Sequence, residues 1–242
     1  MTPHPHHDPD ESVNPAPMRS VQRVRREPDT VPPMVGNERG QVAGQPEPAA
    51  DGAAADAPGI SRRVTVRPLA NGDQGEFLTL VAASVDLHHP WMSLPATPEK
   101  FQAYLARYEQ PGAESLLICL RDTGAIAGLV NINNIIRGRF QNGSLAYAAF
   151  APTAGQGYLS EGLDLVLRYA FQKLRLHRLD AQIQPGNHAS LKLVRRLGFR
   201  MEGYSPDLLF IDGAWRDHER WAMTSSMTDF ALADPHPTLP AR

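Results

Sequence analysis

One loop of the sequence combines the residue types best suited to holding an anion. Residues 151–161 read Ala-Pro-Thr-Ala-Gly-Gln-Gly-Tyr-Leu-Ser-Glu and lie between a strand-like run and a long helical pattern. Glycine lets backbone N–H groups approach a ligand closely. A helix N-terminus adds unpaired N–H groups and a partial positive charge. The loop therefore predicts a cradle for a pyrophosphate, with a plain glycine-rich turn into a helix as the alternative.

This loop differs from two familiar phosphate motifs. It has no Gly-Lys-Ser/Thr sequence, and it lacks the third glycine of the dinucleotide fingerprint. The loop by itself does not identify its ligand.

A second group of polar residues begins a later helix. Asn187 opens a helical pattern over residues 187–197, and Ser190 follows one turn later. Asparagine commonly caps helices, so capping is one interpretation. The other is that both side chains point into a cleft between two strands.

The hydrophobic pattern predicts the elements that position these residues. Helical spacing indicates a helix after Asp73, whose side chain can cap it, and further helices from Thr97 to a stop at Pro111-Gly112, over 159–174 and over 187–197. Turn residues mark 122–124, 142–143 and 212–213. Strand-like runs lie at 62–69, 114–120, 125–136, 144–150 and 179–183, with alternating apolar residues in the first and the last, and two more strands fit within 199–227. This order predicts an α/β sandwich with a mixed sheet.

Composition divides the chain into three parts. Residues 1–60 contain no aromatic residue and hold 11 of the 22 prolines, so they cannot bury enough apolar surface to fold. We expect a disordered Pro-rich tail at 1–60, one catalytic domain at 61–228 and a flexible tail at 229–242.

Charge and cysteine content exclude several classes of protein. The net charge of −2 argues against bulk binding of polyanions, and we expect no sequence-specific nucleic-acid partner. No apolar run is long enough for a membrane span, and the polar N-terminus does not read as a signal peptide. A single cysteine suits the cytoplasm. His4, His6 and His7 lack partner ligands, so no metal site is expected.

Several motifs together resemble a known family. They are Gly155-Gln156-Gly157-Tyr158 with Glu161, Leu176-His177-Arg178-Leu179, Asn187 with Ser190, Leu197-Gly198-Phe199, Glu202-Gly203, and the run from Ile211 to His218. The region from about residue 62 to 228 resembles the GNAT acetyltransferase superfamily, and within it the RimJ/RimL group of ribosomal-protein-alanine N-acetyltransferases, RimJ most of all.

The resemblance implies the GNAT fold, with about seven strands, about four flanking helices and two splayed strands that bind acetyl-CoA as co-substrate. Those strands would be roughly 144–151 and 178–184. The family pattern departs at Ala154, usually Arg or Gln, and at Leu159, usually Gly or Ala. The implied cofactor contacts are the backbone of Gln156, Gly157, Tyr158, Leu159 and Ser160 for the pyrophosphate, Asn187 for the pantetheine or the bound substrate, and N–H groups near Ala149 and Phe150 for the thioester carbonyl.

Amine acetylation needs a base for the ammonium and an acid for the departing thiolate. By the same resemblance Ser190 is the candidate acid, and Asp207 is a candidate base near the position of a late Glu in relatives, with a water chain as the alternative. Trp91 and His89 are expected near the acceptor.

The acceptor is the least determined part of the prediction. A terminal α-amine, with a pKa of about 8, needs less help than lysine at about 10.4. The leading hypothesis is acetylation of the N-terminal alanine of a ribosomal or other protein, with possible ribosome association. The alternatives are a small-molecule acetyltransferase for a polyamine, aminoglycoside or amino acid, and a non-catalytic module that binds CoA or the ribosome.

Overall fold

The computed structural model describes residues 63–230. The predicted tail at 1–60 lies outside the described residues, as does nearly all of 229–242, so these boundaries stay predictions. No helix among residues 63–230 combines the length and apolar character needed to cross a bilayer.

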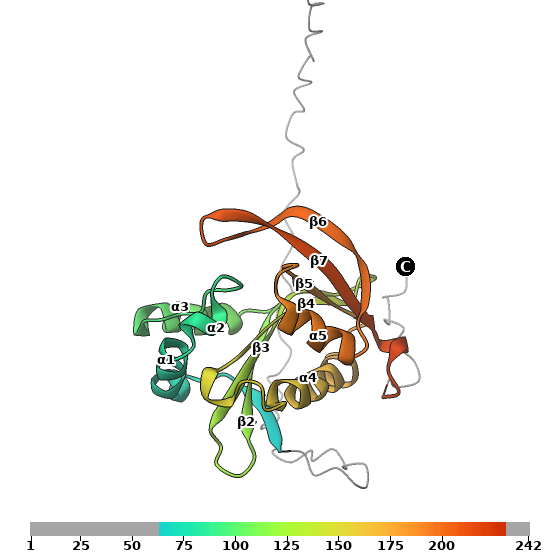
Figure 1. Cartoon of the computed structure of the whole chain (residues 1–242). Helices are drawn as coiled ribbons and strands as arrows, with labels where there is room; N and C mark the ends of the chain where they lie inside the picture. The colour runs from blue at the N-terminus through green and yellow to red at the C-terminus, as the bar shows by residue number, and fades with distance from the viewer. Residues whose placement is uncertain (1–62, 231–242) are drawn as a thin grey trace, which may run out of the picture. The chain divides into compact units, whose positions relative to one another are not determined.

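One mixed sheet of seven strands organises the described chain (Figure 1). Its order is β1-β2-β3-β4-β5-β7-β6, and every neighbouring pair is antiparallel except β4 and β5, which run parallel. The predicted mixed sheet is confirmed. The strands are β1 (Val64–Pro68), β2 (Glu114–Leu120), β3 (Ile126–Ile136), β4 (Asn142–Ala149), β5 (Arg178–Ile183), β6 (Arg200–Ile211) and β7 (Ala214–Thr224).

Helices cover the sheet through two separate cores. One core contains Phe77 of α1 and Phe101 of α3. The other core contains Leu163 of α4 and Leu191 of α5. The described α-helices are α1 (Gln74–Ala82), the single turn α2 (Val85–His88), α3 (Pro98–Tyr108), α4 (Tyr158–Arg168), which continues as a π-helical turn (Tyr169–Lys173), and α5 (His188–Arg196). Short 3-10 turns lie at Asn71–Asp73, Ala151–Thr153 and Ser225–Met227.

Local signals explain most of these boundaries. Thr97 caps α3 by accepting a hydrogen bond from the Lys100 N–H at 3.3 Å, with Pro98 as the first helical residue. Asp73 lies at the N-cap position of α1, as predicted, but the expected side-chain cap is wrong, because its carboxylate makes no capping hydrogen bond to this helix. The Asp73 carboxylate accepts hydrogen bonds from the Arg67 guanidinium at 2.7 and 2.8 Å and from the Ala70 N–H at 2.8 Å.

The predicted turn at Asn142-Gly143 is also wrong, because both residues lie inside β4. A Cβ atom on Gly143 would lie 2.7 Å from Cγ2 of Ile132 on β3. Close packing of the strands, rather than turn geometry, therefore requires this glycine.

The parallel pair β4–β5 separates part-way along its length. Pairing runs from Asn142 opposite Arg178 to Leu145 opposite Ala181 and then stops, although β4 continues to Ala149 and β5 to Ile183. The two expected splayed strands are thus present, and backbone groups on the facing edges beyond this point lack a strand partner in this pair.

Candidate active site

The predicted anion loop has the backbone geometry that such a site requires. Helix α4 begins at Tyr158, and Gly157 before it has a left-handed φ of 87° that disfavours residues with a Cβ. No side chain caps this end. The first hydrogen bond within the helix runs from the Glu161 N–H to the Gly157 carbonyl oxygen, at 3.1 Å. The N–H groups of Tyr158, Leu159 and Ser160 therefore lack acceptors within the helix. Binding of CoA by Gln156 through Ser160 stays a prediction.

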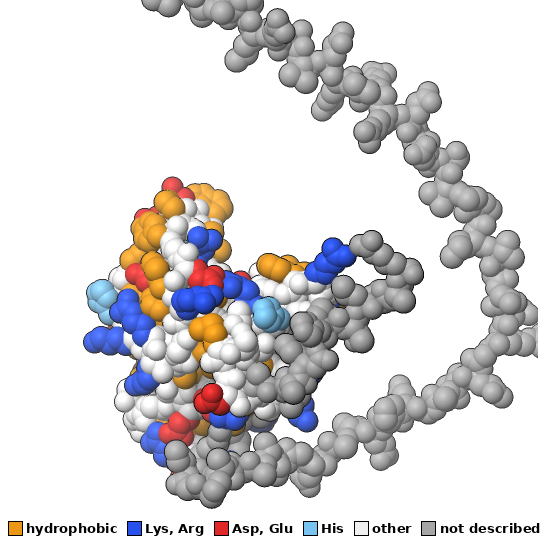
Figure 2. Space-filling model, turned by 90° about the vertical axis from the view of Figure 1, so that its right-hand side faces the viewer, with side chains coloured by type: hydrophobic (Ala, Val, Ile, Leu, Met, Phe, Trp, Pro, Cys, Tyr) orange, Lys and Arg blue, Asp and Glu red, His pale blue; other side chains and the backbone are white. Residues whose placement is uncertain are grey.

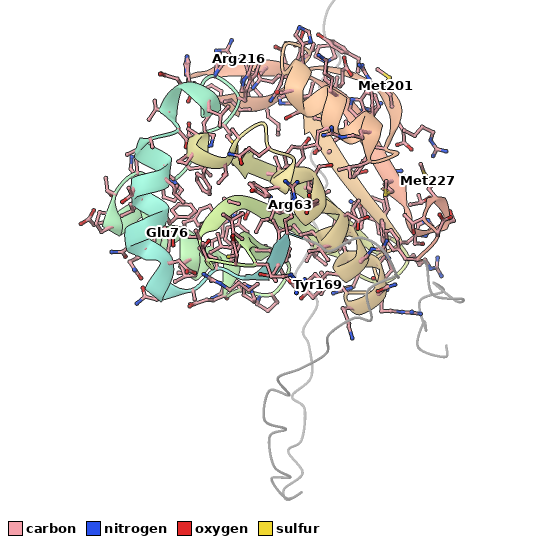
Figure 3. The ribbon with its side chains drawn as sticks, turned by 60° about the horizontal axis from the view of Figure 1, so that its bottom comes forward. Arg63, Glu76, Tyr169, Met201, Arg216 and Met227 are labelled. Carbon is pink, nitrogen blue, oxygen red and sulfur yellow. The ribbon has the colours of Figure 1, made fainter. Side chains whose placement is uncertain are left out.

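Arg63 holds this loop in place, although the sequence alone did not reveal it. Its Nε donates to Glu161 at 2.7 Å and its Nη2 to the Gln156 carbonyl at 3.0 Å, and the guanidinium lies 4.5 Å from the centre of the Tyr158 ring. Figure 3 labels Arg63 within the fold. Almost a hundred residues separate Arg63 from Glu161, so no local pattern connects them.

The departure from the family pattern at Leu159 is accommodated on β3. The Leu159 Cδ1 lies 3.3 Å from the place where a Cβ of Gly128 would be. The leucine side chain therefore packs over Gly128, and the loop backbone keeps its N–H groups.

A cavity of about 810 Å³ lies where β4 and β5 separate. It is bounded by the segment after α2, by β4, β5 and the start of α5, and by the end of the β6–β7 hairpin. Of the predicted site residues, the cavity brings together Trp91, Asn187 and Ser190.

Asn187 satisfies both interpretations offered by the sequence. Its Oδ1 accepts a hydrogen bond from the Ser190 N–H at 3.1 Å, which makes it the N-cap of α5. Both residues also line the cavity.

Tyr147 on β4 was missed by the sequence prediction. Its hydroxyl is buried without a hydrogen-bond partner among residues 63–230, and the side chain lines the same cavity. Burial raises the pKa of Tyr147 to about 12. The nearby Ser190 side chain acts in the opposite direction, although the two hydroxyls do not form a full hydrogen bond. Tyr147 is therefore a neutral donor at neutral pH.

His218 on β7 is a second residue that the sequence prediction left without a role. It is 2% exposed, lines the cavity, and its Nδ1 lies 2.8 Å from the Arg216 carbonyl oxygen. In the sequence, His218 stands out only as the last residue of the run from Ile211 to His218, which is one of the motifs that carry the family resemblance.

The remaining predicted residues lie apart from the cavity wall. Asp207 is exposed in a bulge of β6, where its φ is 47° and its N–H donates to Asp217 at 2.9 Å. His89 lies at the rim, 3.4 Å from Asp212. The Ala149 carbonyl accepts a hydrogen bond from His88 Nε2 at 2.8 Å, and Phe150 is fully buried in the core. Their predicted roles stay untested.

Hydrophobic side chains gather at the top of the view in Figure 2, where Figure 1 places the β6–β7 hairpin. Leu209 and Phe210 line the cavity and are 43% and 61% exposed, and the Trp215 ring meets that of Phe210 edge-on at 5.6 Å. Within residues 63–230, no group of three or more His, Cys, Asp or Glu side chains is arranged to hold a metal ion.

Comparison with known proteins agrees with this architecture. The "Acetyltransferase (GNAT) domain" model matches residues 63–200. The chain is 39% identical over 104 residues to the [ribosomal protein uS5]-alanine N-acetyltransferase of Escherichia coli, covering 43% of this chain and 54% of that protein, so the match spans about half of that relative. It is 28% identical over 166 residues to a probable N-acetyltransferase, YjcK, of Bacillus subtilis, covering 65% of this chain and 92% of that protein.

Solved structures share the fold. Mycobacterium smegmatis RimJ in complex with CoA-disulfide superposes with a TM-score of 0.64 at 24% identity, over 69% of this chain and 84% of that one. Spermidine N-acetyltransferase from Vibrio cholerae, in complex with CoA and spermine, gives 0.60 at 19% identity, over 69% and 98%. Since the GNAT model covers more than half of the 242 residues, the chain belongs to the GNAT acetyltransferase family.

Proposed function

We propose that this protein transfers the acetyl group of acetyl-CoA directly to an amine, and that this amine is the free α-amine of a ribosomal or other protein that begins with alanine. The observation that carries this proposal is the separation of β4 from β5 after Leu145, with a cavity at the gap and a backbone cradle at the start of α4. A thioester arm resting in the gap would present its carbonyl carbon to an amine in the cavity.

Each predicted residue has one task in this proposal. N–H groups from Gln156 to Ser160 bind the pyrophosphate, and Asn187 hydrogen-bonds the pantetheine. N–H groups near Ala149 and Phe150 stabilise the oxyanion. Ser190 donates a proton to the thiolate when the C–S bond breaks.

The charges around the cavity favour a protein terminus over a polyamine. Of the carboxylates that line it, Asp180 is paired with Arg178 at 2.7 Å, and Asp212 accepts from Ser93 at 3.0 Å near His89. A polycation would need unpaired carboxylates. The exposed Leu209 and Phe210 suit the apolar side chains of a peptide instead. The E. coli relative acts on the alanine of a ribosomal protein. Ribosome association and a cytoplasmic location are parts of the same proposal.

Release of free thiol from acetyl-CoA tests the proposal. The acceptors are ribosomal peptides that begin with Ala or Ser, the same peptides with blocked α-amines, spermidine and kanamycin. We expect turnover on the peptides with free α-amines. Turnover only on spermidine or kanamycin would replace the protein acceptor by a small amine. CoA binding without turnover on any acceptor would favour a non-catalytic module.

A further inference from the structure

We propose that Nε2 of His218 is the general base that removes the proton from the acceptor amine. This inference rests on the proposed N-acetyltransferase function and names the base in the same site. It replaces Asp207, which is exposed and does not line the cavity.

The strand register places His218 at the mouth of the gap, on the face of the sheet opposite the core beneath α4 and α5. The β5–β7 pairing ends with Ile183 opposite Glu219, so His218 lies one residue beyond it, at the mouth of the gap. Trp221 and Met223 of β7 pack into the core beneath α4 and α5. Because side chains alternate along a strand, His218 projects to the opposite face.

The side chains that could donate a proton to the thiolate come from the other face of the sheet. Tyr147 packs against the core beneath α4 and α5, and Ser190 belongs to α5 itself. All three side chains nevertheless line one cavity. The gap between β4 and β5 therefore has a base candidate on one face of the sheet and hydroxyl donors on the other.

Hydrogen bonding fixes which nitrogen of His218 is free. A carbonyl oxygen only accepts, so the 2.8 Å contact to Arg216 requires the proton on Nδ1. In the neutral ring the lone pair is then on Nε2. Among residues 63–230 no hydrogen bond to this Nε2 is found, and the side chain faces the cavity.

The surroundings keep this imidazole neutral enough to act as a base. Burial lowers the pKa of His218, whereas the Arg216 carbonyl and the adjacent Asp217 carboxylate oppose that shift. The other titratable or charged groups that line the cavity are Arg107, Tyr147, Asp180 and Asp212. Asp180 is engaged by Arg178 and Asp212 lies at the rim with His89, so neither carboxylate is as available as Nε2.

The proton balance is complete with these groups. His218 takes one proton from the α-ammonium, and the freed amine attacks the thioester carbon to form the C–N bond. The second amine proton is lost to solvent as the tetrahedral intermediate collapses. The C–S bond breaks, Ser190 protonates the thiolate, and His218 and Ser190 re-equilibrate with water. At pH 7 an α-amine with a pKa of about 8 is mostly protonated, so a base is needed to produce the neutral amine that attacks the thioester.

The test compares His218→Asn with the wild-type protein. The asparagine amide can still donate to the Arg216 carbonyl but supplies no base, and His177→Asn, at an exposed histidine outside the cavity, is the matched control. We expect His218→Asn to lower kcat/KM for the peptide about 100-fold at pH 7, with the KM for acetyl-CoA unchanged. The deficit should shrink above about pH 9, where the amine deprotonates without help.

Three results would overturn the inference. One is a variant with normal turnover. Another is a deficit that is equal at every pH and accompanied by a lower Tm, which indicates a structural role. The third does not depend on turnover: imidazole NMR that finds the proton of His218 on Nε2 at pH 7. Absence of turnover by the wild-type protein on every acceptor would instead refute the proposed function, and the role of His218 with it.

Discussion

The two ends of the candidate site are built in different ways. At the start of α4 the groups without an intrahelical partner are backbone N–H groups, positioned by left-handed glycines and tied down by Arg63. The cavity is instead lined by polar side chains, including those of Tyr147, Ser190 and His218. A backbone site tolerates changes of side chain, whereas a side-chain site depends on each residue that forms it.

This difference explains why local sequence patterns outline the cradle more completely than the cavity, of whose lining only Trp91, Asn187 and Ser190 were predicted. The cradle lies within eleven consecutive residues, so its glycines and helix start appear as one local pattern. The cavity joins residues from Trp91 to His218, which strand pairing brings together. No local spacing encodes such a set, and Asp207 is a candidate base only because it lies near the position of a late Glu in the relatives that the sequence resembles.

The largest effect should come from the hydroxyls of the cavity. We expect Ser190→Ala to lower kcat about 100-fold, because the thiolate would lose its proton donor. Tyr147→Phe should lower kcat about 10-fold, since its buried hydroxyl has no partner among the described residues and needs one from the bound substrate. Steady-state kinetics at saturating acetyl-CoA measure both.

The order of these two effects sharpens the assignment. A larger loss for Tyr147→Phe would make the tyrosine, whose pKa of about 12 keeps it protonated, the proton donor in place of Ser190. Normal kcat in both variants would remove side-chain hydroxyls from the mechanism and would break the contrast between the two ends.

The fold itself was more predictable than the site. Strand-like runs of apolar residues, alternating or continuous, indicated the seven strands, and capping residues such as Thr97 and Asn187 marked the helix starts. The errors came from tertiary contacts. Gly143 resembles a turn residue but is required by the approach of β3, and Asp73 resembles a cap but is engaged by Arg67. Sequence patterns describe what a residue prefers locally, not what packs against it.

A smaller effect is expected at the cradle. Gly157→Ala would place a Cβ on a residue with a φ of 87° and 3.2 Å from Arg63 Nη2. A left-handed conformation costs a non-glycine residue about 1–2 kcal/mol, so the KM for acetyl-CoA should rise about 10-fold with kcat nearly unchanged. Steady-state kinetics with varied acetyl-CoA, together with calorimetric titration of CoA, measure this change.

Gly72→Ala is the matched control, because nothing lies within 4 Å of its added Cβ and its backbone is not left-handed. If Gly157→Ala lowers kcat but leaves CoA affinity intact, the loop is not a backbone cradle.

The smallest effect is expected at the cavity rim, where the segment after α2 meets the β6–β7 turn. Asp212 lies 3.4 Å from His89 and accepts a hydrogen bond from Ser93 at 3.0 Å. Asparagine tolerates the left-handed φ of 47° at this position, so Asp212→Asn changes the charge and preserves the backbone. Exposed pairs contribute about 0–1 kcal/mol, so the peptide KM should rise at most about 5-fold, and less in high salt. Asp122→Asn, in the exposed β2–β3 turn, is the control. A change in the KM for acetyl-CoA instead of the peptide would place the rim on the cofactor side, and the two ends of the site would no longer be separate.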